Sequence, residues 1–365
     1  MSCTRLEFNR EKLTALRTHG RLKTVELCFD SFNETKGGKY RLSLSRGYPV
    51  YLAGEPHHGK STFTYELLMQ LSERHGYKHF CYFGEAGYPE DVYAELCELY
   101  IGKHFSSVYN GTRENPYAMS ENERMQAEHF VNEHFYILPV ENRMTADHFY
   151  KALEVAQTQY GVTFDTAVID PIYDLDDFEA REKSINQLLK KINRHCFESQ
   201  RIDFVVNHVS EPDRQKETNK RLPAKPDQWY GGKVWFRRAF LQLLIHRPTP
   251  RLSTVSDERI EENEAHIYVQ KAKPNGIGTL GQIKLFFDWR SKRYYEVTPA
   301  GYENYAKSSR LYKEKEKPKK VEVQTITASP SEAFGEDVMQ RKGVRTIPVS
   351  SIDIETDENE EEFPF

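Results

Sequence analysis

The stretch from Gly54 to Ser61 constrains the fold more than any other part of this 365-residue chain. It reads Gly-Glu-Pro-His-His-Gly-Lys-Ser and fits the pattern G-x-x-x-x-G-K-[ST] at all four fixed positions. In this pattern the glycines let the backbone wrap an anion, so that backbone N–H groups point at the α- and β-phosphates. Lys60 is then expected to reach the β- and γ-phosphates, and the Ser61 hydroxyl to help hold Mg²⁺. The motif predicts a nucleotide site made of Gly54, Glu55, Pro56, His57, His58, Gly59, Lys60, Ser61 and Thr62.

The residues on either side place this loop between a strand and a helix. Pro49–Ala53 is a short apolar run typical of a buried strand, and Phe63, Leu67, Leu68 and Leu71 fall on one helical face. A strand, a glycine loop and a helix in this order put a helix N-terminus against a phosphate. The context favours a functional loop over a chance match.

The chain after this loop alternates short apolar runs with helical patterns, which favours an α/β fold with a mainly parallel central sheet flanked by helices. One such helical pattern is Ile185, Leu188, Leu189 and Ile192. The first five runs are separated by long helical segments, whereas the later runs lie closer together and are expected to extend the sheet with antiparallel pairing. The predicted strands are Pro49–Ala53, Phe80–Gly84, Phe135–Leu138, Thr166–Ile169, Phe204–Asn207, Phe240–His246, His266–Lys271 and Ile283–Asp288.

Composition divides the chain into three expected parts: an arm or linker at 1–45, one α/β domain at 46–300, and a flexible linker with an acidic tail at 301–365. Ser351–Phe365 contains seven acidic residues and no basic one, so the rest of a chain of net charge −4 carries +3. Residues 301–365 have little apolar area to bury and are expected to be disordered. Within them, Lys313–Lys320 reads as a solvated linker or as a weak nucleic-acid contact.

The cysteine pattern and the hydropathy bear on the compartment. The five cysteines are scattered and form no C-x-x-C pair, which favours reduced thiols in a cytoplasm over a disulfide framework or a zinc site. No signal peptide is seen, and no apolar run is long enough to span a bilayer.

Three predicted strands end in residues that suit phosphate chemistry. Thr166–Asp170 ends in a carboxylate that is expected to support Mg²⁺, or else to cap the turn at Pro171. Glu85 follows a second strand and is expected to position or deprotonate the attacking water, or else to belong to the acidic start of the next helix. His208 ends a third strand, where it either contacts the γ-phosphate or is a structural histidine.

Two further segments carry clustered positive charge. Arg214–Arg238 combines basic residues with glycines and aromatics, as in loops that track single-stranded nucleic acid; the alternative is an ordinary loop whose aromatics pack into the core. Lys271 and Lys273 lie two residues apart at a strand end, where they are expected to share a face and clamp a phosphate. If they face outward, this phosphate belongs to a nucleotide held by a neighbouring subunit. The basic residues expected to contact nucleic acid, which the resemblance described below implies is DNA, are Arg214, Lys216, Lys220, Arg221, Lys225, Lys233, Arg237 and Arg238.

This ordered set, from about Phe29 to Val297, resembles the RecA-fold motor domain of DnaB- and Twinkle-like replicative helicases of superfamily four, and most closely their phage-encoded versions. The resemblance implies that residues 46–300 form a RecA-like P-loop ATPase and helicase motor. It also implies that Glu85 is the catalytic glutamate, Asp170 the Walker B aspartate and His208 the sensor. Lys271 and Lys273 resemble the trans-acting finger motif, although Lys273 stands where the family usually has arginine.

The resemblance further implies a ring, expected to be a homohexamer, that uses ATP and Mg²⁺ to translocate 5′ to 3′ on single-stranded DNA in a bacterial or phage-infected cytoplasm. A RecA-like recombinase that forms filaments, and an ATP-gated loader or scaffold, are the alternatives. The last residues, Asp357–Phe365, resemble the acidic, Phe-terminated tip of bacterial single-stranded DNA-binding proteins. They are expected to dock on a polymerase, primase or other replication protein, unless they only solubilise the chain.

Overall fold

The computed structural model describes the chain in segments, and all of them belong to one compact unit, Met1–Lys313. The predicted acidic tail lies outside the described residues. The described residues are 10–19, 24–33, 35–36, 39–86, 88–109, 111, 113–140, 144–210, 213–214, 222–248, 263–273, 276–298, 301 and 303–313.

A central sheet organises this part of the chain. Within the described residues it has ten strands, in the order β16-β15-β14-β13-β12-β5-β11-β10-β6-β9. The six strands from β12 to β9 are parallel to their neighbours, and β13 to β16 continue the sheet with antiparallel pairing. Their bounds are β5 Val50–Gly54, β6 His79–Phe83, β9 Phe135–Leu138, β10 Thr166–Asp170, β11 Ile202–His208, β12 Leu241–His246, β13 Glu264–Ala272, β14 Gly281–Asp288, β15 Arg293–Val297 and β16 Glu303–Tyr305.

The prediction of a mainly parallel sheet flanked by helices is confirmed, and each of the eight predicted strands is present. One detail differs. The strand expected to open the antiparallel part, β12, lies parallel to β5 and antiparallel only to β13. The long segment between β11 and β12 brings β12 back beside β5. The short distance in sequence between β12 and β13 did not indicate this parallel pairing.

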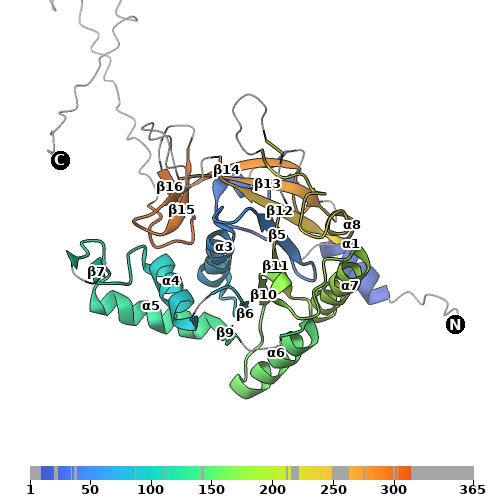
Figure 1. Cartoon of the computed structure of the whole chain (residues 1–365), viewed down its shortest axis with the longest axis horizontal. Coiled ribbons are helices and arrows are strands. Elements are labelled where there is room, and N and C mark those ends of the chain that lie inside the picture. The colour runs from blue at the N-terminus through green and yellow to red at the C-terminus, as the bar shows by residue number, and fades with distance from the viewer. Residues whose placement is uncertain are drawn as a thin grey trace, which may run out of the picture. The chain divides into compact units, whose positions relative to one another are not determined.

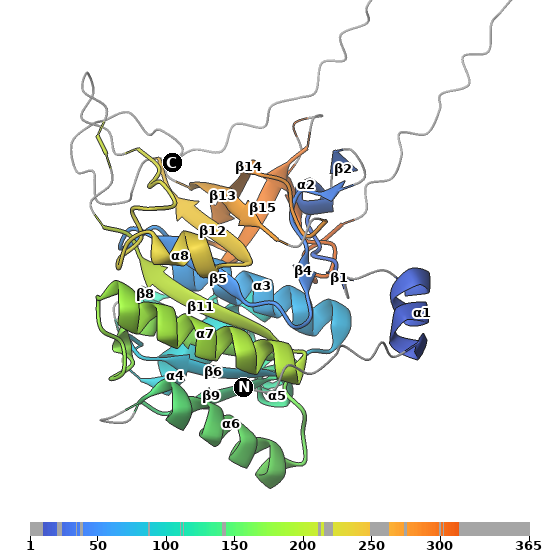
Figure 2. The same ribbon diagram turned by 90° about the vertical axis from the view of Figure 1, so that its right-hand side faces the viewer.

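Helices cover both faces of the sheet, as Figures 1 and 2 show. One core contains residues of α3, α4 and α5, and the other contains residues of α6, α7 and α8. In α7 the buried side chains recur at helical spacing, Ile185, Leu188, Leu189, Ile192 and Cys196, which is the stripe that the sequence predicted. The helices are α1 Arg10–His19, α2 Asp30–Asn33, α3 Lys60–His75, α4 Pro89–Ile101, α5 Glu121–His134, α6 Ala146–Tyr160, α7 Glu182–Ser199 and α8 Val234–Arg238.

Residues near both expected domain boundaries take part in the same core. Phe29, Phe32 and Leu44 are buried in the core that includes α3. Beyond residue 300, β16 pairs with β15, and Ala306 is buried in that core. A short 3-10 helix, η1 Ile172–Asp174, and three two-stranded ribbons complete the described elements. The ribbons are β1 Thr24–Val25 with β4 Leu44–Ser45, β2 Thr35–Lys36 with β3 Lys39–Tyr40, and β7 Val108–Tyr109 with β8 Arg113–Glu114.

A buried ion-pair network ties the antiparallel strands to α3. The guanidinium of Arg293 donates to both oxygens of Glu66, at 2.8 and 2.9 Å, and to Glu73 at 3.3 Å. It also donates to the carbonyl of Leu99. Breaking a buried pair of this kind by removing one partner costs about 3–5 kcal/mol, because the other charge stays buried. The network therefore fixes β15 against the helix that follows the phosphate loop.

Candidate functional site

The phosphate loop joins the centre of the sheet to α3. Val50–Gly54 of β5 is buried at every position, and α3 begins at Lys60. A side chain at position 54 would put its Cβ 2.5 Å from the carbonyl oxygen of Ile245, and Gly59 has φ +80°, so both positions need glycine. Gly59 gives the first turn of α3 no side-chain cap. The N–H groups of that turn are therefore available to an anion.

The four residues between the two glycines of the loop differ in burial, which the motif did not predict. Pro56 and His57 are exposed, whereas Glu55 and His58 are buried. His57 has φ 64°, in the left-handed region at the exposed tip. The side chains of Glu55 and His58 therefore lie in the interior, and only the backbone of these two residues is suited to hold a phosphate.

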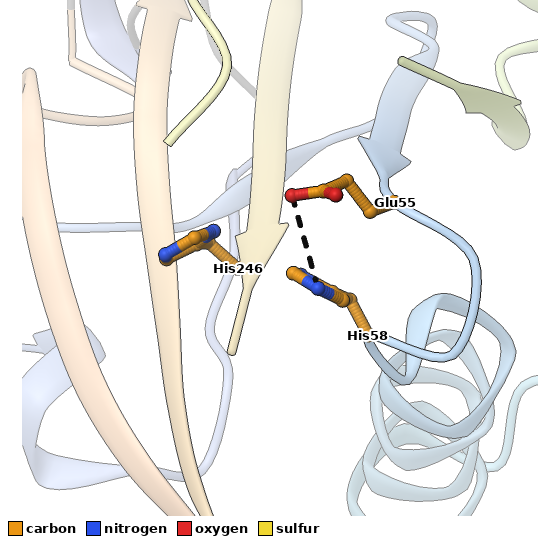
Figure 3. Close-up of side chains that lie close together, drawn as sticks. All are labelled: Glu55, His58 and His246. Carbon is orange, nitrogen blue, oxygen red and sulfur yellow. Dashed lines mark ion pairs between the residues drawn. The ribbon is translucent and has the colours of Figure 1, made fainter. Parts of the chain in front are cut away.

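The buried side chains of Glu55 and His58 meet His246 from the end of β12, as Figure 3 shows. One atom from each residue lies within 4.8 Å of the others, and His58 Nε2 is 3.8 Å from Glu55 Oε1. The backbone N–H of Arg247 donates to His58 Nδ1 at 3.1 Å, so in the neutral ring the proton is on Nε2. Metal ligation through Nε2 requires the opposite tautomer. The cluster is therefore better suited to hold the loop against the end of β12 than to bind a metal.

Lys60 lies folded back along the loop. Its Nζ donates to the carbonyl of Glu55 at 3.1 Å. Burial lowers the pKa of Lys60, and the negative charges of Asp170, Glu85 and Glu55 oppose that change. The ammonium is thus placed among the carboxylates of the neighbouring strand ends.

Asp170 ends β10 next to Ser61, and both line a pocket of about 310 Å³. Burial raises the pKa of Asp170 to about 6, against the lowering effects of a hydrogen bond from Ser61 and the charge of Lys60. Asp170 Oδ2 is buried and has no hydrogen-bond partner among the described residues. A buried carboxylate oxygen without a partner beside a hydroxyl suits Mg²⁺, which prefers oxygen ligands. Asp91 and Glu95 of α4 line the same pocket and were not predicted as part of the site.

Glu85 follows β6 and lies beside Asp170 at the same edge of the sheet. The backbone N–H of Gly84 donates to the carbonyl of Asp170 at 2.9 Å, which joins the two strand ends. The Glu85 side chain is 55% exposed and lines the pocket that contains Ser61. Burial raises its pKa, whereas Lys60 lowers it. This carboxylate is therefore open to solvent, unlike that of Asp170.

His208, at the end of β11, lies close to Glu85. Its Nε2 is 3.8 Å from Glu85 Oε2 and 3.0 Å from the hydroxyl of Tyr173. Burial, together with the charge of Lys60, lowers the pKa of His208 to about 4. The ring is therefore neutral at neutral pH. Tyr173, from the segment that follows Asp170, was not predicted as a partner of this histidine.

The two predicted finger lysines have different surroundings. Lys271 is buried, and its Nζ donates to the carbonyl oxygens of Phe236 and Arg237, at the end of α8. It also lies over the ring of Phe236, 5.0 Å from the centroid. Lys273 is exposed, and both lysines line a pocket of about 690 Å³. In this state Lys273 faces outward, while Lys271 is engaged within its own chain.

The structure describes five of the eight basic residues predicted to contact DNA. Lys225 pairs with Asp213 at 2.7 Å, Arg237 with Glu182 at 2.5 Å, and Arg238 Nε donates to Asn186 at 2.5 Å. Arg214 and Lys233 are exposed. Trp229 and Trp235 of the same segment are fully buried in the core. Lys216, Lys220 and Arg221 lie outside the described residues.

The strand ends that carry these side chains define a class of protein. A phosphate loop at the centre of a mainly parallel sheet, with acidic and histidine side chains at the same carboxyl edge, is the architecture of a RecA-like phosphate-loop domain. No family model matches the chain, and no curated protein matches its sequence.

Solved structures match the fold. The chain is similar to a DnaB-like replicative helicase whose interactions with primase were described, with a TM-score of 0.54 and 14% identity over 68% of this chain. The match spans 58% of the length of that helicase. It is also similar to a second solved structure, an ATPase domain, with a TM-score of 0.54, 14% identity, and coverage of 68% of this chain and 84% of that one. The chain therefore has a RecA-like fold similar to those of these two structures.

Among the helices of the described part, none has the length and apolar character needed to cross a membrane.

Proposed function

We propose that this protein is an ATP-dependent DNA helicase of the DnaB- and Twinkle-like type, similar to phage-encoded versions, which acts in DNA replication. The observation that carries the proposal is the meeting of Lys60, Ser61, Glu85, Asp170 and His208 at one edge of a helicase-like sheet. Each of these residues was expected from its own strand end or loop, and their proximity at this edge of the sheet supports the proposal.

The proposed hydrolysis step assigns a role to each of these residues. ATP binds with its phosphates against the loop Gly54–Ser61 and the first turn of α3, and Lys60 offers its charge to the β- and γ-phosphates. The oxygen of a water molecule attacks the γ-phosphorus, the bond to the bridging oxygen of ADP breaks, and Glu85 orients the water and accepts its proton. Ser61 and Asp170 would hold Mg²⁺, which would supply positive charge against the phosphates.

The second half of each site comes from the adjacent subunit in this proposal. Lys273 is exposed at the end of β13 and extends toward the neighbour's γ-phosphate. Lys271 would have to release the carbonyls of Phe236 and Arg237 before its Nζ could do the same. The expected assembly is a ring, in the simplest case a homohexamer.

Single-stranded DNA is the proposed track, with 5′ to 3′ movement. The exposed Arg214 and Lys233 support this proposal, and Arg237 and Arg238 would exchange their present partners for phosphates. His208 is proposed to couple hydrolysis to this segment, because it faces Glu85 on one side and leads into the segment on the other. The acidic tail would recruit a polymerase, primase or other replication protein. The proposed compartment is the cytoplasm of a bacterial or phage-infected cell, which agrees with the buried free thiols of the described cysteines.

A forked DNA substrate tests the activity. The full chain with ATP and Mg²⁺ is expected to displace the labelled strand of a fork, and the Lys60→Ala variant is expected to displace none. Displacement should require a 5′ single-stranded tail. ATP hydrolysis without any strand displacement would argue against the helicase and favour a loader or scaffold.

A RecA-like recombinase remains the second candidate because the sheet and the phosphate loop are shared between the two classes. Electron microscopy of the protein with ATP and single-stranded DNA separates them. Closed rings support the helicase proposal, whereas continuous helical filaments support a recombinase.

A further inference from the structure

A third pocket is lined by His208, the histidine that faces Glu85 at the candidate nucleotide site. Its volume is about 440 Å³, within the usual range of ~300–1,000 Å³ for small-molecule sites. It is formed by the segments that follow β10 and β11, and its lining is mostly aromatic: Tyr173, Phe178, Ala180, His208 and Tyr230. Of these residues, His208 connects the pocket to the candidate nucleotide site, because its Nε2 lies 3.8 Å from Glu85 Oε2.

Three hydrogen bonds fix the backbone of Tyr230, one of the residues that line this pocket. Its backbone N–H donates to the carbonyl of His208 at 2.9 Å. Its carbonyl accepts from Asn207 Nδ2 at 3.0 Å and from Trp235 Nε1 at 2.7 Å. Tyr230 nevertheless stays 42% exposed, while Trp229 and Trp235 are fully buried. The fold thus uses three hydrogen bonds to present one aromatic ring to solvent.

The rings around the pocket are arranged as a stacking surface. Phe178 and Tyr230 are nearly parallel, with an interplanar angle of 27° and centroids 6.0 Å apart. Tyr173 stands edge-on to His208, with an interplanar angle of 72°. Flat aromatic faces that are partly open to solvent bind nucleobases, because every base has a π-face. This surface differs from a phosphate site, which needs cations or N–H groups.

Positive charge lies beside the rings in the sequence. Arg181 follows the lining residue Ala180, and its side chain is 84% exposed although it lies 3.9 Å from Glu179. Lys233 is three residues after Tyr230 and is also exposed. An aromatic surface flanked by exposed cations suits a base that is attached to a phosphate backbone. These charges favour a strand of nucleic acid over an uncharged ligand.

We propose that this pocket binds one nucleobase of single-stranded DNA, stacked against Tyr230 and Phe178. The inference rests on the proposed function and adds a base contact to the phosphate contacts assumed there. A base in this pocket touches His208, which faces Glu85 across the nucleotide site. Strand binding and the hydrolytic site would thereby share one histidine.

Fluorescence anisotropy with two strands of equal length tests the proposal. One strand is oligo-dT, and the other is an abasic oligomer with the same phosphate backbone and no bases. The full chain, with a non-hydrolysable ATP analogue, is expected to bind oligo-dT about tenfold more tightly than the abasic strand. Tyr230→Ala should lose this preference, whereas Tyr230→Phe, which keeps the ring, should retain it. Thermal melting of the three proteins checks that each is folded.

The outcomes separate this proposal from the one on which it rests. Equal binding of the two strands by the wild-type protein, or a preference that survives in Tyr230→Ala, would overturn the base pocket and leave the DNA motor intact. Failure to bind either strand would overturn both. Competition with free dTMP gives a further outcome. An excess of dTMP could lower the affinity for oligo-dT to the affinity measured for the abasic strand, while dTMP itself binds equally well when no strand is present. That result would assign the pocket to free nucleotides and contradict the strand proposal.

Discussion

Glu85 and Asp170 end neighbouring strands, and their surroundings assign them different tasks. Asp170 is buried, with one oxygen that lacks a hydrogen-bond partner among the described residues, whereas the side chain of Glu85 is 55% exposed in the same pocket. Two carboxylates in unlike environments suit two different roles in one reaction. The buried one is suited to a cation and the exposed one to water.

Glu85→Gln tests the role given to the exposed carboxylate. The amide keeps the size of the side chain and removes its ability to accept a proton. We expect the variant to bind ATP with little change and to hydrolyse it about 100-fold or more slowly. Nucleotide binding by fluorescence titration and turnover by phosphate release measure the two quantities separately. Full turnover in this variant would remove Glu85 from the mechanism.

Asp170→Asn tests the energetic cost of the buried carboxylate. Burial raises the pKa of Asp170 to about 6, so the folded protein binds this proton more tightly than the unfolded chain does. The ionised group therefore lowers stability progressively as the pH rises from about 4 to about 6, and the cost is complete above that window. At pH 7.5, in metal-free buffer, the variant should be more stable by about 1–3 kcal/mol.

The pH dependence provides the control for this prediction. In urea unfolding, the advantage of Asp170→Asn over the wild type should shrink as the pH falls toward about 4, where the wild-type carboxyl is protonated as well. An advantage that is the same at both pH values, or a loss of stability at pH 7.5, would contradict the account.

At the residue scale, the sequence marks as candidates the side chains whose spacing a local motif dictates. Lys60 and Ser61 follow from the loop pattern, and Glu85, Asp170 and His208 follow from strand ends. It did not reveal Tyr173, His246, Asp91 or Glu95, because these arrive through tertiary packing and no local pattern marks them. The interior placement of Glu55 and His58 also depends on β12, a strand remote in the sequence.

At the element scale, α8 is joined to two neighbours. Arg237 and Arg238 attach it to α7, and Lys271 of β13 donates to the carbonyls at its end. A cation at a helix C-terminus is favourable, since the terminal carbonyls have no partners within the helix. Lys271 therefore connects the strand that presents Lys273 to the segment proposed to contact DNA.

Hydrogen exchange measures this connection. Lys271→Ala removes the cation from the end of α8, so the amides of residues 234–238 should exchange faster than in the wild type. Lys273→Ala is the matched control, because its side chain is exposed and no contact between it and α8 is seen in the described residues; exchange in α8 should be unchanged. Equal exchange in all three proteins would show that Lys271 does not hold the helix.

The strands were predictable because buried strands of a parallel sheet read as short apolar runs between helical patterns. β15 and β16 were not predicted. Arg293–Val297 is rich in charged and tyrosine residues, and its Arg293 is buried only because Glu66 and Glu73 neutralise it. The short helix α8 was hidden in a basic segment that reads as a loop. Both features depend on partners far away in the chain.

At the scale of the whole molecule, the proposed mechanism requires two copies of the chain. The loop and Glu85 would belong to one copy, and Lys273 to the next. Mixing Lys60→Ala protein with Lys273→Ala protein tests this arrangement, because some interfaces in mixed assemblies contain both intact residues. ATP hydrolysis by the mixture should exceed that of either variant alone. No gain on mixing, under conditions where mass measurement shows mixed assemblies, would contradict a shared site.

The most direct test of the central claim is the rate of ATP hydrolysis with and without single-stranded DNA. The claim is that cleavage of ATP at Gly54–Ser61 is coupled to a strand held near His208 and Tyr230. The wild-type chain should hydrolyse ATP faster when an oligonucleotide is added, and Lys60→Ala should show neither the basal nor the stimulated rate. A wild-type rate that does not change with oligonucleotide would contradict the claim.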